Sequence, residues 1–161
     1  MRSGPLQCGQ SALLCTAKDS MRSRNAACPH LWMATQSLHT RVLIADDHAD
    51  AAETLSALLQ LISPSPMVIF VAFDGLQALR LATRAPYPDA VILDIDMPRM
   101  NGIEAACAIR QALGELTPAL IAVSGNVDRI DLASTVFGHV LHKPVDADRL
   151  LTILRSAPPH H

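Results

Sequence analysis

The chain has 161 residues, 50% of them hydrophobic, which suits a single domain with its own core and an appendage. Residues 1–40 hold four basic residues and one acidic residue, so positions 41–161 keep nine basic and 14 acidic residues and a net charge of about −5. An acidic segment of this kind argues against nucleic acid as a partner, and no apolar run approaches the roughly 20 residues that a membrane-spanning helix needs. We therefore expect a soluble, cytoplasmic protein that binds neither nucleic acid nor membrane.

The first 40 residues show no sustained apolar periodicity and are rich in polar side chains, which predicts a disordered tail over residues 1–40. Their basic, acid-poor composition also has a faint likeness to an organelle transit peptide. A third interpretation is that translation starts at Met33, close to the first ordered pattern. N-terminal sequencing of the natural protein would contradict this hypothesis by finding residues upstream of Met33.

Three of the four cysteines lie in this tail, at intervals that lack the paired short spacing of a zinc site: Cys8, Cys15 and Cys28. We expect free thiols there. The fourth, Cys107, falls within an apolar helical pattern, which predicts a small buried side chain.

From Arg41 onward, short apolar runs alternate with helical patterns. The runs predict buried strands at residues 42–45, 67–71, 90–94, 119–123 and 140–141. Apolar residues at helical spacing predict helices at residues 52–62, 76–81, 103–113 and 150–154. Asp146 is the expected N-cap of the last of these helices. Strands separated by helices predict an α/β fold, in which right-handed crossovers wind both faces of a parallel sheet.

Four of the predicted strands end in polar residues: Asp46-Asp47, Asp94, Ser124 and, near the end of the fifth strand, Lys143. Because the carboxyl ends of parallel strands meet at one edge of a sheet, we expect these side chains to lie together. Crowded carboxylates repel one another unless a divalent cation neutralises them, and oxygen ligands favour Mg²⁺ or Mn²⁺. A carboxylate beside such a cation and an ammonium is suited to attack phosphorus. The residues therefore predict a phosphoryl group on Asp94, with a hydrogen bond from Ser124.

Each of these residues also has a simpler structural explanation. Asp46, Asp47 or His48 could cap the following helix, Ser124 could be a turn residue, and Lys143 could be a surface charge. A cap explains one acidic residue but not two in succession after a buried strand. The convergence of all four positions favours a functional site, because clusters of ionisable groups in clefts are more often functional than isolated charges.

In combination, four motifs resemble the receiver domain of two-component response regulators, over residues 41–156: Asp46-Asp47, Asp94 to Gly102, Ser124-Gly125 and Lys143-Pro144. The resemblance implies a flavodoxin-like, doubly wound sheet of five parallel strands in the order 2-1-3-4-5. It also implies that the phosphoryl group comes from a phosphohistidine on a sensor histidine kinase or a histidine phosphotransfer protein.

The resemblance further implies a role for each matching residue. Asp94 would be the phosphoacceptor. Asp47, Asp94 and the backbone carbonyl of Asp96 would ligate Mg²⁺, and Asp46 would help through a water molecule. Ser124 and Lys143 would hold the phosphoryl group and take part in the switch. The bond between Lys143 and Pro144 would be cis, a state that is common only before proline.

Two features depart from the pattern of the family. Where the family often has a Tyr or Phe that reports phosphorylation, this chain has Val140, which has no ring to rotate. Ser124 and Lys143 are 19 positions apart, about three fewer than in many receivers, which predicts a fourth helix about one turn short. Only six residues follow Arg155, so we expect a short tail at residues 157–161 and a receiver that acts by protein contact.

Other functions fit the sequence less well. A phosphorylation-independent scaffold would explain Val140 and the short helix, but not the intact acidic site. A haloacid-dehalogenase-type phosphatase would use Asp94-Ile95-Asp96 as its nucleophile motif, yet that motif usually ends the first strand. A nucleotide-binding flavodoxin-like protein would need a Gly-rich phosphate loop after the first strand. We expect at most self-phosphorylation and self-dephosphorylation, without turnover of small substrates.

Overall fold

The computed structural model describes residues 40–126 and 133–157 of the chain. The predictions of a disordered tail, of a start at Met33 and of free thiols at the three N-terminal cysteines concern residues outside these ranges. Most of the expected C-terminal tail also lies outside them.

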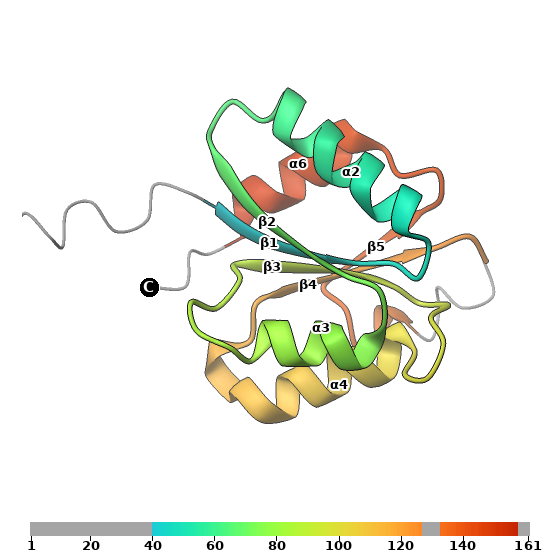
Figure 1. Ribbon diagram of the computed structural model, residues 1–161. Coiled ribbons are helices and arrows are strands. Elements are labelled where there is room, and N and C mark those ends of the chain that lie inside the picture. Colours follow the sequence, from blue (N-terminus) through green and yellow to red (C-terminus); the bar gives the residue numbers. More distant parts are fainter. Residues whose placement is uncertain (1–39, 127–132, 158–161) are drawn as a thin grey trace, which may run out of the picture. The chain divides into compact units, whose positions relative to one another are not determined.

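A parallel five-stranded sheet forms the centre of the domain (Figure 1). Its strands, in the spatial order β2-β1-β3-β4-β5, are β1 (Thr40–Ala45), β2 (Met67–Ala72), β3 (Ala90–Asp94), β4 (Ala119–Ser124) and β5 (His139–His142). All five residues of β3 are buried, as expected for a central strand that is covered on both faces. The predicted α/β fold class and the strand order 2-1-3-4-5 are confirmed.

Within the described ranges, two pairs of helices cover the two faces of the sheet (Figure 1). Helices α2 (Ala49–Ile62) and α6 (Ala147–Ser156) lie on one face, and α3 (Gly75–Ala82) and α4 (Gly102–Leu113) lie on the other. A short 3-10 helix, η1 (Gly114–Leu116), follows α4. None of the helices within the described ranges has the length and apolar character needed to cross a bilayer.

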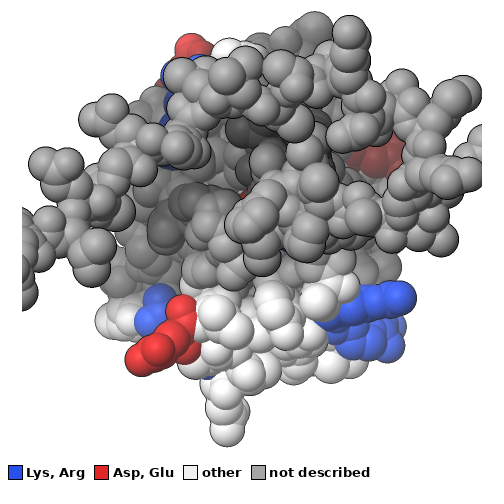
Figure 2. Space-filling model, turned by 90° about the vertical axis from the view of Figure 1, so that its left-hand side faces the viewer, with Lys and Arg blue, Asp and Glu red and all other residues white. Residues whose placement is uncertain are grey.

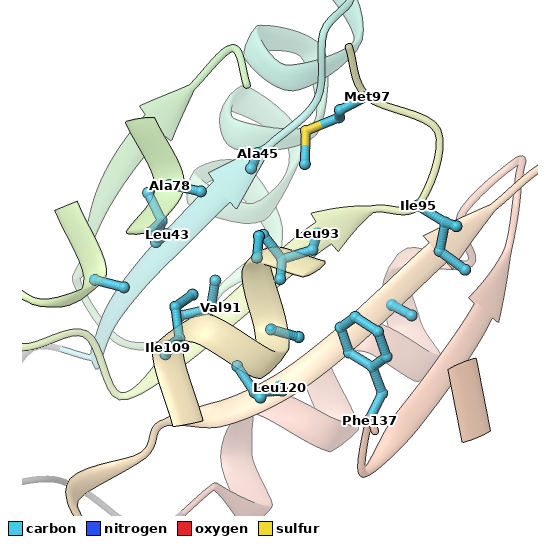
Figure 3. Packing of buried hydrophobic residues seen from close by; sticks show 14 of the residues in the cluster. Leu43, Ala45, Ala78, Val91, Leu93, Ile95, Met97, Ile109, Leu120 and Phe137 are labelled. Carbon is cyan, nitrogen blue, oxygen red and sulfur yellow. The ribbon is translucent and has the colours of Figure 1, made fainter. Parts of the chain in front are cut away.

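Alternation along the strands divides the apolar side chains between two cores. Leu43, Val91 and Leu93 belong to the core on the side of α3 and α4 (Figure 3). Ile44 and Ile92, the neighbours of these residues in sequence, belong to the core on the side of α2 and α6. Helices cover both faces of β1 and β3, which explains why the sequences of these two strands are continuously hydrophobic.

Side chains at the helix starts fix where the helices begin. The Asp74 side chain accepts a hydrogen bond from the backbone of Gln77 at the start of α3, and Asn101 forms a capping box with Glu104 at the start of α4. Asp146 accepts bonds from the first turn of α6, which confirms the predicted cap. By contrast, His48 precedes α2 without a side-chain capping bond.

The prediction that Cys107 is buried is wrong, because its side chain is exposed. Helix α4 buries Ala105, Ala106 and Ile109. Each residue turns the helix by about 100°, so Cys107 points away from the face that these residues share. The apolar character of a cysteine did not decide its position; the angular position on the helix did.

The prediction of a shortened fourth helix remains open. It concerns the segment between β4 and β5, of which residues 127–132 lie outside the described ranges.

The charges on one described surface are mixed. Below the grey atoms in Figure 2, basic side chains lie on one side and acidic side chains beside basic ones lie on the other, with uncharged surface between them. This part of the surface is unlike the continuous basic face that duplex binding requires. The expectation that nucleic acid is not a partner stays a prediction.

We expect Gly102→Ala to destabilise the domain. A Cβ on Gly102 would lie 2.2 Å from the backbone carbonyl oxygen of Asp94, so the loop between β3 and α4 would have to move. The expected loss in the free energy of unfolding is about 1–3 kcal/mol, as for other overpacked sites. Urea unfolding measures this loss. Gly138→Ala is the matched control, because its Cβ would meet nothing closer than 3.9 Å. Equal losses in the two variants would contradict the prediction.

Candidate functional site

The carboxyl ends of β1, β3, β4 and β5 meet at one edge of the sheet. The register pairs Ala45 with Leu93, so Asp46 follows β1 beside Asp94 at the end of β3. Ser124 ends β4 and is paired with His142, the residue before Lys143. Asp46, Asp94 and Ser124 are all buried. The structure therefore brings the predicted residues to one edge, as their positions after the strands required.

The Lys143 ammonium joins two of these carboxylates. Its Nζ donates to Oδ2 of Asp46 and to Oδ2 of Asp94, each at 2.7 Å. Burial disfavours the ammonium, but its hydrogen bonds to Asp46 and Asp94 and their charges outweigh this effect, so the pKa of Lys143 is raised above its ordinary value. Lys143 is therefore a protonated counter-ion inside the site, and the interpretation as a surface charge does not apply.

Backbone groups hold the other oxygen of each carboxylate. Oδ1 of Asp46 accepts from the backbone N–H of His48 at 2.9 Å, and Oδ1 of Asp94 accepts from the backbone N–H of Asp96 at 3.1 Å. Both carboxylates are thus fixed at two points. Asp46 organises the turn that precedes α2, while its second oxygen remains in the cluster with Lys143.

Ser124 makes its bonds within its own loop. Its Oγ accepts from the backbone N–H of Asn126 at 3.0 Å and lies 3.2 Å from the carbonyl oxygen of Asn126. Ser124 is thus the last residue of β4, its side chain bonds to the loop that follows, and it lies at the same edge of the sheet as Asp94. Its predicted hydrogen bond to a phosphoryl group stays a prediction.

The acidic residues include oxygen atoms that could ligate a divalent cation. Asp46, Asp47 and Asp94 are three carboxylates near one ammonium, which leaves two negative charges to be balanced. Ligand atoms of Asp46, Asp47 and His48 lie within 4.8 Å of one another. His48 Nδ1 is 2.9 Å from Oδ1 of Asp47, and the Asp47 side chain is 26% exposed. Carboxylate oxygens with access to solvent suit Mg²⁺, which keeps several water ligands.

This ligand group differs in part from the predicted one. It includes His48, for which the sequence suggested only a capping role, and it does not include Asp94, whose Oδ2 pairs with Lys143. Asp96 is exposed, and its backbone N–H binds Asp94. Ligation by Asp94 and by the Asp96 carbonyl therefore stays a prediction.

An ion pair beside the site links two loops. Arg99 Nη2 donates to Oδ2 of Asp74, a buried carboxylate at the start of α3. Arg99 has a φ of 67°, an uncommon value for a residue other than glycine. Nothing in the sequence indicated this pairing over 25 positions. The pair ties the loop after Asp94 to α3.

Two expectations from the family pattern can be checked at β5. The bond between Lys143 and Pro144 is cis, as predicted. Val140 is half-buried and packs against the core on the side of α3 and α4. A branched aliphatic side chain in this place has no ring that could exchange between a buried and an exposed position.

Comparison with known proteins agrees with this geometry. Residues 42–155 match the response regulator receiver domain, and the chain belongs to this family. It is 35% identical over 121 residues to a protein-glutamate methylesterase/protein-glutamine glutaminase of Geobacter metallireducens, covering 75% of this chain and 32% of that protein. It is also 35% identical over 88 residues to the transcriptional regulatory protein PrrA of Mycobacterium leprae, covering 55% of this chain and 36% of PrrA. The chain thus spans about a third of the length of these relatives.

Solved receiver domains share the fold over nearly their whole length. The response regulator domain of Thermotoga maritima CheB is 28% identical with a TM-score of 0.63, covering 74% of this chain and 96% of that domain. The receiver domain of a sensor histidine kinase from Pseudomonas aeruginosa is 27% identical with a TM-score of 0.64, covering 74% of this chain and 97% of that domain. That structure has a magnesium ion coordinated in its active-site cleft. The present chain is therefore a receiver domain of the two-component signalling type.

We expect Lys143→Met to lower the free energy of unfolding by about 1–3 kcal/mol at neutral pH, because two buried carboxylates lose their counter-ion. Solvent reaches part of the Lys143 side chain and screens its ion pairs, so the expected loss is smaller than for a fully buried pair. The pKa of Lys143 is higher in the folded protein than in the unfolded chain. Its ion pairs therefore stabilise the fold fully at pH values below the ordinary lysine pKa, and this stabilisation is lost as the pH rises through the pKa of the folded state.

Urea unfolding of the unmodified chain and of Lys143→Met, from neutral to strongly alkaline pH, tests this prediction. The difference between their free energies of unfolding should stay constant through the neutral range and become smaller at the alkaline end. A difference that widens with pH would show that the ammonium is not the stabilising form.

Because Lys18 is the one other lysine in the sequence, NMR with labelled lysine can follow the titration of Lys143 directly. Asp94→Asn should lower its pKa.

Proposed function

We propose that this receiver takes a phosphoryl group onto Asp94 from a phosphohistidine on a sensor histidine kinase or a histidine phosphotransfer protein. The observation that carries the proposal is the pair of 2.7 Å contacts that Lys143 Nζ makes with the carboxylates of Asp94 and Asp46. A carboxylate held beside a protonated lysine at a sheet edge has the parts that phosphoryl transfer needs: a nucleophile and a cation for the transferred charge.

In the transfer, the bond between phosphorus and the imidazole nitrogen of the donor breaks, and a bond forms between phosphorus and a carboxylate oxygen of Asp94. The imidazole takes up a proton as it leaves. Asp94 is held through Oδ1 by the Asp96 backbone, which limits the orientations that its carboxylate can take. Lys143 is within reach of phosphoryl oxygens attached to Asp94, because its Nζ already contacts that carboxylate.

We also propose that Asp46, Asp47, Asp94 and the Asp96 backbone carbonyl hold Mg²⁺ or Mn²⁺. When bound, the cation balances the carboxylates and the charge on the transferred phosphoryl oxygens. The excess of two negative charges over the Lys143 ammonium supports this ligand set. These residues would present oxygen atoms to the cation in fixed positions. The hydrogen bonds from the backbone to Asp46 and Asp94 hold the two carboxylates in place.

The signal itself is proposed to pass through protein contacts. Attachment of a phosphoryl group to Asp94 changes the partners available to Lys143, which is bonded through its backbone N–H to Ser124 at 3.0 Å. Ser124 can turn its hydroxyl toward the phosphoryl group only by giving up bonds to Asn126. The relatives include a methylesterase and a transcriptional regulator, so the type of target varies within the family. A cytoplasmic location stays a prediction.

Acetyl phosphate tests the acceptor site without knowledge of the kinase. We expect the intact mass to rise by one phosphoryl group in the presence of Mg²⁺ and to stay unchanged with a chelator. Asp94→Asn should abolish the gain. Asp89→Asn, which alters a buried carboxylate before the opposite end of β3, should retain it.

The same experiment distinguishes the proposed function from its main alternative. That alternative is a scaffold that keeps the fold and has lost the switch, and Val140 favours it. If acetyl phosphate labels a known receiver but not this chain, the scaffold is the better explanation and the proposed function is wrong. Release of phosphate from small phosphomonoesters at catalytic rates would instead point to a phosphatase.

Lys143→Ala is expected to uncouple the modification from its consequence. Asp94 should still be labelled by acetyl phosphate, while the chemical shift changes that phosphorylation causes around Ser124 and β5 should be lost. NMR spectra before and after labelling measure both properties on one sample. Unchanged spectral shifts in Lys143→Ala would contradict the assigned role.

A further inference from the structure

We propose that Asp74 and Arg99 are a positioning pair for phosphoryl transfer to Asp94. Their ion pair holds the loop between β3 and α4 in the conformation in which the Asp96 backbone orients the Asp94 carboxylate. The inference rests on the proposed acceptor role of Asp94. Both residues of the pair act through the loop, without contact to the phosphoryl group.

The loop begins beside the acceptor and is closed at its base. Ile95 follows Asp94 and donates its backbone N–H to the carbonyl oxygen of Val123 at 3.0 Å. Its own carbonyl oxygen accepts from the backbone N–H of Gly102 at 3.1 Å. Between these ends, the Asp96 backbone N–H donates to Oδ1 of Asp94 at 3.1 Å. A shift of the loop therefore moves a donor that orients the acceptor carboxylate.

The far part of the loop is held against the start of α3. Asp74 is buried, and its Oδ1 accepts from the backbone N–H of Gln77 at 2.7 Å. Its Oδ2 accepts from the Arg99 guanidinium, which balances the charge of a carboxylate that is largely removed from water. Met100 approaches so closely that a Cβ on Gly75 would lie 2.3 Å from the Met100 carbonyl oxygen. The loop and α3 thus meet through an ion pair and a tight backbone contact.

The backbone of Arg99 indicates that the ion pair has a holding role. Its φ of 67° lies in the left-handed region, which is unfavourable for most residues that carry a Cβ. The Arg99 side chain is 65% exposed, so packing contributes little to keeping this conformation. The ion pair with Asp74 is the described side-chain contact that offsets the backbone cost.

A second anchor limits the size of the expected effect. The Met97 side chain is buried in the core on the side of α3 and α4 (Figure 3). Because this anchor remains when the ion pair is removed, the loop should stay folded and lose only part of its positional order. A change in the rate of transfer without loss of the fold is the expected signature.

Labelling by acetyl phosphate at saturating Mg²⁺ measures the effect on transfer. We expect Arg99→Gly to lower the rate constant of labelling about fivefold, equivalent to roughly 1 kcal/mol, the upper end for an exposed ion pair. Glycine tolerates the φ of residue 99, so this variant removes the guanidinium without straining the backbone. Asp74→Asn should have a similar effect, because asparagine still caps α3 but carries no charge. Arg99→Lys keeps a cation and should retain most of the rate.

A double-mutant cycle shows whether the two residues act as a pair. Because the ion pair is already broken in Arg99→Gly, adding Asp74→Asn should cause little further loss, and multiplied losses would overturn the proposal. Asp89→Asn is the matched control, because it alters another buried, ion-paired carboxylate, which is bonded to Arg41 before the opposite end of β3. The control should be labelled as fast as the unmodified chain.

Hydrogen exchange at the Asp96 amide measures the position of the loop without any transfer. In metal-free, unphosphorylated protein, this exchange should be faster in Arg99→Gly and in Asp74→Asn, because the bond to Asp94 is formed less often. Exchange at amides within β3, such as that of Leu93, should be unchanged, since the fold remains. Exchange at Asp96 that is the same in the unmodified chain and in both variants would overturn the proposal.

The two measurements separate this inference from the proposed function. If the unmodified chain gains no phosphoryl group, the proposed function fails, and the exchange at Asp96 still decides whether the ion pair holds the loop. If the unmodified chain is labelled and Arg99→Gly keeps both its rate and its exchange at Asp96, the acceptor role stands and the positioning role is wrong.

Discussion

The Lys143 ammonium lies between two buried carboxylates, and the arrangement of the edge depends on this contact. Asp46 and Asp94 are out of water, so each needs a counter-ion or several hydrogen-bond donors. Lys143 supplies the charge, and the backbone of His48 and Asp96 supplies the remaining donors. A stable cluster of this kind requires that residues far apart in the sequence arrive together. Lys143 and Asp46 are separated by 97 positions.

The sheet meets this requirement through its strand order. Asp46 follows β1 and Asp94 ends the adjacent β3, whereas Lys143 follows β5, with β4 between it and β3. Neighbouring strands are roughly 4.8 Å apart, so a side chain from the loop after β5 has to cross a strand to reach Asp94. A long, flexible lysine side chain can do this. The hydrogen bond from the backbone N–H of Lys143 to the carbonyl oxygen of Ser124 fixes the position of the Lys143 backbone.

The same edge joins two kinds of chemistry. Above the strands, carboxylates and an ammonium make a site suited to phosphoryl groups and divalent cations. Toward α2, the neighbouring side chains are Ile44, Ile92 and other aliphatic residues of the core. Asp94 belongs to both regions because β3 ends where the apolar core gives way to the charged edge.

The α/β fold class and the charged residues of the sheet edge could be predicted from the amino-acid sequence, because both rest on local patterns. Two-sided apolar runs such as that of β3 predict buried parallel strands, and a polar residue after each run must lie at the carboxyl edge. Tertiary structure decided what each side chain contacts. Ser124 bonds to its own loop, Arg99 pairs with Asp74, and Cys107 faces outward. These outcomes depend on the geometry of loops and on helix rotation, which bring together residues that no local pattern connects.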